Sequence, residues 1–403
     1  MLDTQQKLQS NISKVLFINF SYMFLVLIPV IVPFFQQYGL SMEQIYILQS
    51  IFAISTVVLE VPSGYVADLL GRKNSLIAAG IFSGCGMLIL NFSESFYGFI
   101  LFELLTAISV SLFSGSDVAL IYDTLAQLKH KSFSESAVLG RKIFSSQIGE
   151  TAASLLGGAL ALYSLNLPAK IHAITAWIPF LIALTLYEPP RKKMDKLRHL
   201  ENLRYIYNSL FRKSRLLTLI VLNLMVYGVS TLLAVWAFQG YWKMIDVPLY
   251  YFGYLWAAYN LIVAITGKYA HTAERKLGSV GVIIIIAILP IIGYFGMGYF
   301  VFWAGILFGL AFQVSRGLGQ VILRDALNAR VTADFRATAN SIASLGVRLS
   351  FAFLGPLMGF LIDSEGYSIT FYCFGGFYIA AFFVFCLPLL AQRKHFRELV
   401  DND

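Results

Sequence analysis

The chain contains 403 residues, of which 58% are hydrophobic and only 13% are charged. Soluble domains are about 45–50% apolar and about 25% charged, so this composition excludes an ordinary soluble protein and indicates a membrane protein. In a soluble chain the net charge of +8 would suggest nucleic-acid binding. Here we expect the lipid bilayer as a partner and no nucleic acid, and the useful question is which membrane face carries the Lys and Arg side chains.

Apolar stretches long enough to cross a bilayer, about 20 residues each, recur along the whole chain. The sequence predicts twelve of them, at residues 15–35, 44–67, 75–92, 96–122, 139–163, 169–187, 215–239, 248–270, 279–297, 300–323, 338–362 and 369–391. A longer basic break follows the sixth and begins with a Pro189-Pro190 helix stop. Its apolar residues at helical spacing predict an amphipathic helix on the membrane surface. We therefore expect an N-terminal bundle (1–187), a cytoplasmic linker (188–214) and a C-terminal bundle (215–403).

The distribution of Lys and Arg predicts the orientation. If both termini are cytoplasmic, 26 of the 30 basic residues lie on that side and only Lys170 and Lys243 lie on the other. The positive-inside rule therefore favours an even number of spans with both ends inside the cell, in the inner membrane of a bacterium. The remaining two basic residues, Arg316 and Arg348, fall within apolar spans.

An internal repeat at an offset of about 203 residues relates the two halves. Residues 33–38 (PFFQQY) match residues 236–241 (WAFQGY), and residues 114–125 match residues 316–327 at a Gly, an Asp and a Leu. Two six-helix halves related by duplication are typical of transporters with the substrate path between the halves. The expected fold is an all-α membrane protein with two pseudo-symmetric six-helix bundles.

Residues 64–73, GYVADLLGRK, lie between the second and third predicted spans on the basic side. This segment resembles the signature G-x-x-x-D-x-x-G-R-K of the major facilitator superfamily (MFS). The resemblance implies a twelve-helix secondary transporter that works by alternating access. It also implies an inner gate latch, which would consist of Gly64, Asp68, Gly71, Arg72, Lys73, Asp123 and Glu60. The alternative is that Arg72 and Lys73 only determine topology, although a carboxylate at the membrane edge normally has a partner.

The second copy of this signature is degenerate. His271 replaces the aspartate and Glu274 replaces the second glycine, so a weaker latch is expected there, with Asp325 pairing with Arg275 or Lys276. The helix-5 signature of drug antiporters is also incomplete, since the fifth span has glycines at 149, 157 and 158 but lacks the proline.

Ionisable residues inside apolar spans are candidates for transport chemistry, because a charge at the bilayer centre costs about 2.5–3.5 kcal/mol on insertion scales. Glu150 and Arg348 lie about 15 Å into the fifth and eleventh spans, at equivalent places in the two halves. We expect Glu150 and Asp117 to serve proton coupling, and Arg348 with Arg316 to bind an anionic group of the substrate. A permanent salt bridge between Glu150 and Arg348 is the structural alternative.

Polar and aromatic residues of spans 1 and 7 are further candidates, because these spans line the cavity in the family that the chain resembles. The predicted cavity residues are Asn19, Tyr22, Gln36, Asn223, Tyr227, Trp236 and Gln239. Each of them, taken singly, fits interhelical hydrogen bonding or interfacial anchoring as well as it fits a ligand contact.

Motifs of nucleotide hydrolysis and of common enzyme sites are absent from the sequence, and the five histidines are scattered over loops and tails. We therefore expect no enzyme activity, no metal site and no cofactor. The predicted function is proton-coupled export of a small organic solute by a monomer. Uptake or exchange of an organic anion is one alternative, and a transporter-like sensor without flux is another.

Overall fold

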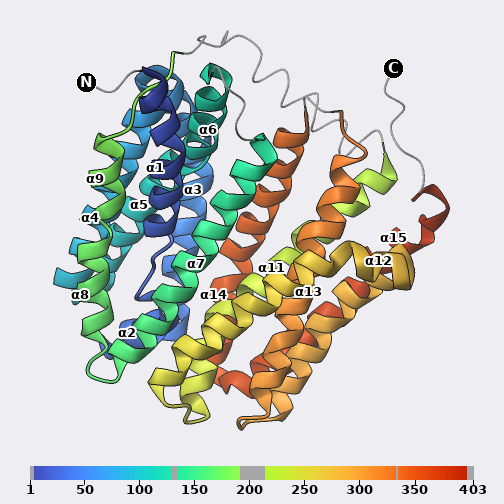
Figure 1. Cartoon of the computed structure of the whole chain (residues 1–403). Coiled ribbons are helices and arrows are strands. Elements are labelled where there is room, and N and C mark those ends of the chain that lie inside the picture. Colours follow the sequence, from blue (N-terminus) through green and yellow to red (C-terminus); the bar gives the residue numbers. More distant parts are fainter. Residues whose placement is uncertain (1–3, 129–133, 191–213, 333–334, 397–403) are drawn as a thin grey trace. The chain divides into compact units, whose positions relative to one another are not determined.

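The computed structural model describes residues 4–128, 134–190, 214–332 and 335–396, and every regular element in these ranges is a helix (Figure 1). In the first half the helices are α1 (Thr4–Tyr22), η1 (Ile28–Val30), α2 (Ile31–Gln37), α3 (Met42–Leu70), α4 (Arg72–Phe92), α5 (Phe96–Phe113), α6 (Ser116–Gln127), α7 (Glu135–Ala161), α8 (Asn166–Thr175) and α9 (Ile178–Leu184). In the second half they are α11 (Arg215–Met244), α12 (Leu249–Tyr299), α13 (Gly305–Asn328), α14 (Arg336–Ala381), η4 (Phe382–Cys386), α15 (Leu387–Ala391) and η5 (Arg393–His395). The predicted surface helix of the linker falls largely on residues 191–213, outside the described ranges.

Eight of the described helical stretches are long and apolar enough to cross a membrane. Two of them, α12 and α14, each contain a non-helical glycine, at Gly278 and Gly366, that separates two consecutive helices. Together the described helices overlap all twelve predicted spans. Helices suit this chain because the bilayer core offers no water to satisfy free backbone groups, and a helix satisfies them within one segment.

The contacts between residues divide the chain into two compact units. Unit 1 comprises Met1–Leu40, Ile51–Met194 and Pro248–Ala257, and unit 2 comprises Ser41–Ser50, Asp195–Val247 and Ala258–Asp403. The units therefore differ from the predicted bundles at two short segments. We call Ser41–Ser50, at the start of α3, the α3 arm, and Pro248–Ala257, at the start of α12, the α12 arm.

The first predicted span is interrupted between α1 and η1, at residues 23–27, where the helix gives way to turns. The carbonyl oxygens of Phe20 and Val26 at this break lie against Gly149 and Gly157 of α7, where a Cβ would overlap them. Glycines at these two positions let α7 approach the irregular backbone closely, as small residues do in membrane helix packing. The equivalent span of the second half, α11, is continuous over 30 residues.

The core of unit 1 is apolar and is built by helices that are distant in sequence. Ile12 and Val15 of α1 pack with Leu76 of α4 and Leu120 of α6, all at most 5% exposed. This packing holds α1, α4 and α6 against one another, and α4 begins with the last two residues of the first signature.

Candidate functional site

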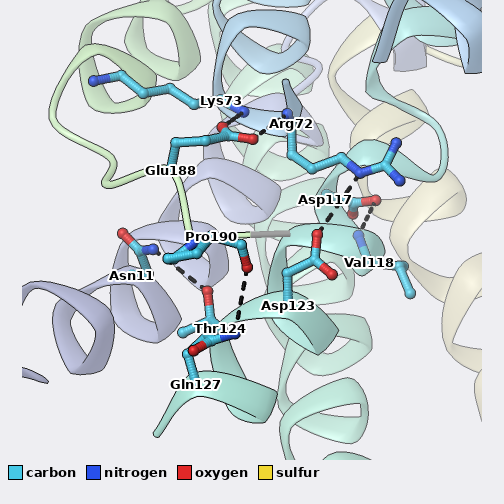
Figure 2. A network of polar contacts seen from close by, with 10 residues as sticks. All are labelled: Asn11, Arg72, Lys73, Asp117, Val118, Asp123, Thr124, Gln127, Glu188 and Pro190. Atoms are coloured by element: carbon cyan, nitrogen blue, oxygen red, sulfur yellow. Dashed lines mark hydrogen bonds and ion pairs between the residues drawn. The ribbon is translucent and has the colours of Figure 1, made fainter. Parts of the chain in front are cut away.

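The turn between α3 and α4 brings the first signature to an acidic side chain that the sequence analysis assigned to the linker. Gly71 has a φ of 104° and is the N-cap of α4. Glu188, which follows α9, accepts hydrogen bonds from Arg72 N at 2.9 Å and from Lys73 N at 2.7 Å (Figure 2). Its carboxylate thereby satisfies two free N–H groups and complements the dipole at the start of α4. Because a Cβ on residue 71 would lie 2.8 Å from Glu188 Oε1, only glycine fits both the φ and the contact.

The side chain of Arg72 extends from this cap toward α6. Its Nε lies 3.9 Å from Oδ2 of Asp123, and the two side chains are 19% and 31% exposed. At this distance and exposure an ion pair contributes about 1 kcal/mol at most, which suits a contact that forms and breaks. Asp68 belongs to α3, but its side chain lies outside the described part of the structure, while Gly64 and Glu60 are exposed on α3.

Side chains of α1 and α6 form hydrogen bonds with the backbone of the residues that follow α9. Asn11 of α1 donates to the carbonyl of Tyr187 at 2.7 Å and accepts from its N–H at 3.0 Å. The same amide lies 3.4 Å from Thr124 Oγ1 of α6, and Gln127 of α6 donates to the carbonyl of Pro190 at 3.3 Å (Figure 2). These hydrogen bonds fix the backbone on both sides of Glu188, which places its carboxylate at the start of α4.

The degenerate second copy has a different, exposed arrangement. His271 Nε2 lies 3.0 Å from Asp325 Oδ2, and His271 Nδ1 lies 3.6 Å from Glu274 Oε2. The sequence suggested Arg275 or Lys276 as the partner of Asp325, whereas the structure gives His271. The imidazole is 60% exposed and carries a charge only when it is protonated, so the two copies differ in both chemistry and burial.

A break in the fourth predicted span creates a buried ion pair within unit 1. Helix α5 ends at Phe113 and α6 begins at Ser116, with Gly115 at a φ of 82° between them. The break places Asp117 in the first turn of α6, where its side chain is 2% exposed. Lys142 of α7 contacts it, with 2.7 Å between Nζ and Oδ2. A buried charge requires a partner of this kind. In the sequence Lys142 stands out only as one of the basic residues that predict the orientation, so the pairing could not be read from it.

Glu150 lies on α7 eight residues after Lys142, which is about 12 Å along the helix. The indole Nε1 of Trp256 donates a hydrogen bond to Glu150 Oε1 at 3.3 Å. Trp256 belongs to the α12 arm and so to the same unit as Glu150. Arg348, the predicted counterpart of Glu150, belongs to unit 2, as does Arg316; both arginine side chains are partly buried.

The candidate cavity residues of the first span make contacts within unit 1. The Asn19 amide donates to the carbonyl of Val15 at 3.0 Å, one turn earlier in α1. Tyr22 lies 2.9 Å from Ser109 Oγ through its hydroxyl and stacks on Phe113 with 3.9 Å between ring centroids. The Asn19 bond stays within α1, Tyr22 packs on α5, and Gln36 of α2 is partly buried. The cavity assignment stays a prediction for all three.

The candidates of the seventh span all lie on α11 in unit 2. Asn223 is fully buried and donates to the carbonyls of Leu219 at 2.7 Å and Phe385 at 2.9 Å, which joins α11 to η4. Tyr227 is 4% exposed and Gln239 is 1% exposed, while Trp236 is partly buried. For these four residues too, a ligand contact stays a prediction.

Among the described residues, no group of three or more His, Cys, Asp or Glu side chains could hold a metal ion. The residues that the sequence missed are Glu188, Lys142 and Trp256, each distant in sequence from its partner.

Comparisons with known proteins agree with this architecture. An uncharacterized MFS-type transporter of Methanocaldococcus jannaschii is 23% identical over 305 residues, which cover 72% of this chain and 74% of that protein. Among solved structures, a mutant of the nucleoside transporter NupG has a TM-score of 0.77 and 14% identity, with 94% of this chain and 99% of that chain covered.

Two further solved structures share the fold. A bacterial homologue of the human lysosomal transporter Spinster has a TM-score of 0.74 and 16% identity, and both chains are covered completely. A D-xylose-proton symporter has a TM-score of 0.68 and 16% identity, with 96% of each chain covered. A family profile described as Major Facilitator Superfamily matches residues 15–333. The chain belongs to the Major Facilitator Superfamily.

Proposed function

We propose that this integral membrane transporter moves a small organic solute by alternating access, coupled to protons and in the direction of export. The observation that carries the proposal is a line of three ionisable side chains inside unit 1. Asp117 is buried against Lys142, and Glu150 lies two turns further along the same helix as that lysine. The two acids contact different groups, since Asp117 pairs with the lysine cation and Glu150 accepts a hydrogen bond from the indole of Trp256.

In the proposal Glu150, which accepts a hydrogen bond from Trp256, is the acid that gains and loses the proton. Asp117 stays paired with the cation of Lys142. Proton exchange at Glu150 then changes the charge on α7 two turns from that ion pair.

The direction and the orientation belong to the proposal as well. The intact first signature, with Glu188 capping α4 and Arg72 near Asp123, supports an inner latch that favours export. The positive-inside rule supports cytoplasmic termini in a bacterial inner membrane. We further propose that the transporting unit is a monomer.

A second candidate function is uptake or exchange of an organic anion. It is favoured by Arg316 on α13 and Arg348 on α14, because two guanidinium groups within apolar helices of one unit are suited to binding a carboxylate or phosphate. A third candidate is a sensor with the transporter fold and no flux.

The experiment uses purified protein in liposomes that contain a pH-sensitive dye. Solutes of the classes named for the structural relatives, nucleosides and D-xylose, are added one at a time together with organic anions. Proton-coupled transport predicts a solute-dependent pH change, and a response confined to anions would favour the second candidate. Absence of any response and of radiolabelled solute flux would favour the sensor.

The variants Glu150→Gln and Asp117→Asn test the coupling residues, and Glu135→Gln, an exposed acid at the start of α7, is the matched control. Loss of proton movement with retained solute flux in Glu150→Gln is the expected result. Unchanged proton movement in that variant would remove Glu150 from the coupling mechanism.

A further inference from the structure

The α12 arm packs on one face of α7 with no room for side chains between the two backbones. A Cβ on Gly158 would lie 2.9 Å from the Cα of Gly253, and a Cβ on Gly253 would overlap the carbonyl oxygen of Ser154. Glycine-mediated approach of this kind makes helix packing close and sensitive to small displacements.

Glu150 lies on the same face of α7 as this contact. Glu150, Ser154 and Gly158 are spaced four residues apart, which aligns them along one side of the helix. On the arm, Gly253 contacts Ser154 and Gly158, and Trp256, three residues later, reaches Glu150 with its indole N–H. The two segments therefore run antiparallel, and Trp256 is the arm residue that contacts the ionisable group.

We propose that Trp256 is a positioning residue through which the α12 arm responds to the charge on Glu150. The inference rests on the proposed function, in which Glu150 exchanges a proton. When Glu150 is ionised, the indole N–H makes a charge-assisted hydrogen bond and holds the arm on α7. When Glu150 is protonated, the bond becomes an ordinary neutral one of roughly half the strength, and the arm is released more often.

Other titratable and charged groups lie on α7, on the helices that contact it and on the arm. They are Asp117 of α6, Lys14 and Tyr22 of α1, Lys170 and His172 of α8, Arg141 and Lys142 of α7 itself, and Tyr250, Tyr251 and Tyr254 of the arm. Of these, Asp117 and Lys142 form their own ion pair two turns from Glu150. The test therefore includes Asp117→Asn, which alters that pair without touching Trp256.

The test measures backbone hydrogen exchange of the α12 arm in full-length protein in lipid nanodiscs, in alkaline and in acidic buffer. Exchange in each buffer is expressed as a protection factor, which corrects for the pH dependence of the chemical exchange rate. In the wild type, opening of the α12 arm should rise about five-fold on acidification, as expected for the weakening of one charged hydrogen bond. Trp256→Phe and Glu150→Gln should both show raised, pH-independent opening, and Trp303→Phe, an exposed tryptophan, should behave as the wild type.

A pH-independent α12 arm in the wild type would overturn the inference, and so would a pH response that survives in Trp256→Phe or vanishes only in Asp117→Asn. If Trp256→Phe does not fold, Glu150→Asp replaces it, because aspartate keeps the carboxylate but is one methylene too short to reach the indole N–H. In this variant the α12 arm should open in alkaline buffer as often as it does in Glu150→Gln. Opening as rare as in the wild type would count against the inference.

The outcome is distinct from that of the liposome experiment. If Glu150→Gln abolishes proton movement but hydrogen exchange of the wild-type α12 arm does not change with pH, the proposed function is supported and the role of Trp256 is refuted. If proton movement survives in Glu150→Gln, the proposed coupling fails, whatever the arm does.

Discussion

The α3 arm and the α12 arm occupy corresponding places in the two halves of the sequence, yet different chemistry holds them. In unit 2, Asp363 of α14 accepts hydrogen bonds from the backbone N–H groups of Met42 at 3.0 Å and Glu43 at 2.8 Å. In unit 1, the side chain of Trp256 donates to Glu150. Both arms pack on glycines, Gly359 of α14 and Gly158 of α7 respectively.

The difference concerns the donors that each arm supplies. The α3 arm offers two peptide N–H groups at a helix N-terminus, and an aspartate of α14 caps them as it would cap its own helix. The α12 arm offers one indole N–H to a glutamate of α7. One arm is therefore held by a two-donor helix cap and the other by a single side-chain hydrogen bond.

The largest effects are expected at the glycines. In Gly359→Ala the new Cβ would lie 2.6 Å from the Cα of Glu43, and in Gly253→Ala it would overlap the Ser154 carbonyl, so each variant must displace an arm. Overpacking of this kind lowers the free energy of unfolding by about 1–3 kcal/mol. Thermal unfolding in detergent measures the loss. Gly376→Ala, a helical glycine with nothing within 4 Å, is the control; equal losses in Gly359→Ala and Gly376→Ala would refute the packing argument.

An intermediate effect is expected at Asp363. Replacement by alanine removes the cap of α3 and should cost about 1 kcal/mol, or a roughly five-fold increase in hydrogen exchange of the α3 arm. Asparagine caps helices almost as well as aspartate, so Asp363→Asn should change exchange much less. If both variants loosen the α3 arm equally, the charge rather than the cap holds it.

The smallest effect is expected at Tyr46 in the α3 arm, whose hydroxyl donates to the carbonyl of Leu233 at 2.7 Å. Tyr46→Phe removes one neutral hydrogen bond, worth about 0.5–1.5 kcal/mol. Exchange should rise in the α3 arm and stay unchanged in the α12 arm. Tyr254→Phe, at an exposed tyrosine of the α12 arm, is the matched control; a change in the α12 arm on Tyr46→Phe would show that the arms are not independent clamps.

Much of the fold follows from the sequence, because runs of apolar residues report directly on membrane crossing. The first signature was likewise visible, since its glycines and charges are contiguous. The cap that Glu188 places on α4 was not, because 116 and 115 residues separate it from Arg72 and Lys73 and backbone donors leave no trace in a sequence.

The interrupted helices illustrate the same limit. Ser114-Gly115-Ser116 was included in one continuous fourth span, and the left-handed φ of Gly115 is what turns Asp117 into the first turn of a new helix. The pairing of Asp117 with Lys142 depends on that turn, and composition alone could not assign it. In contrast, Asn223 was located correctly on its span, but the Phe385 carbonyl that receives its amide is set by packing between α11 and η4.

The segment that follows α9, residues 185–190, is anchored by hydrogen bonds to α1 and α4. Lys14 donates to the carbonyl of Thr185 at 2.7 Å, Asn11 pairs with Tyr187, and Glu188 is fixed on α4. A pulling force on residue 190 would therefore be transmitted to α1 and α4 through these hydrogen bonds as well as to α9 through the backbone. Proteolytic cleavage of the linker should leave residues 185–190 bound in place, so the covalent connection between the halves can be cut without releasing the cap of α4.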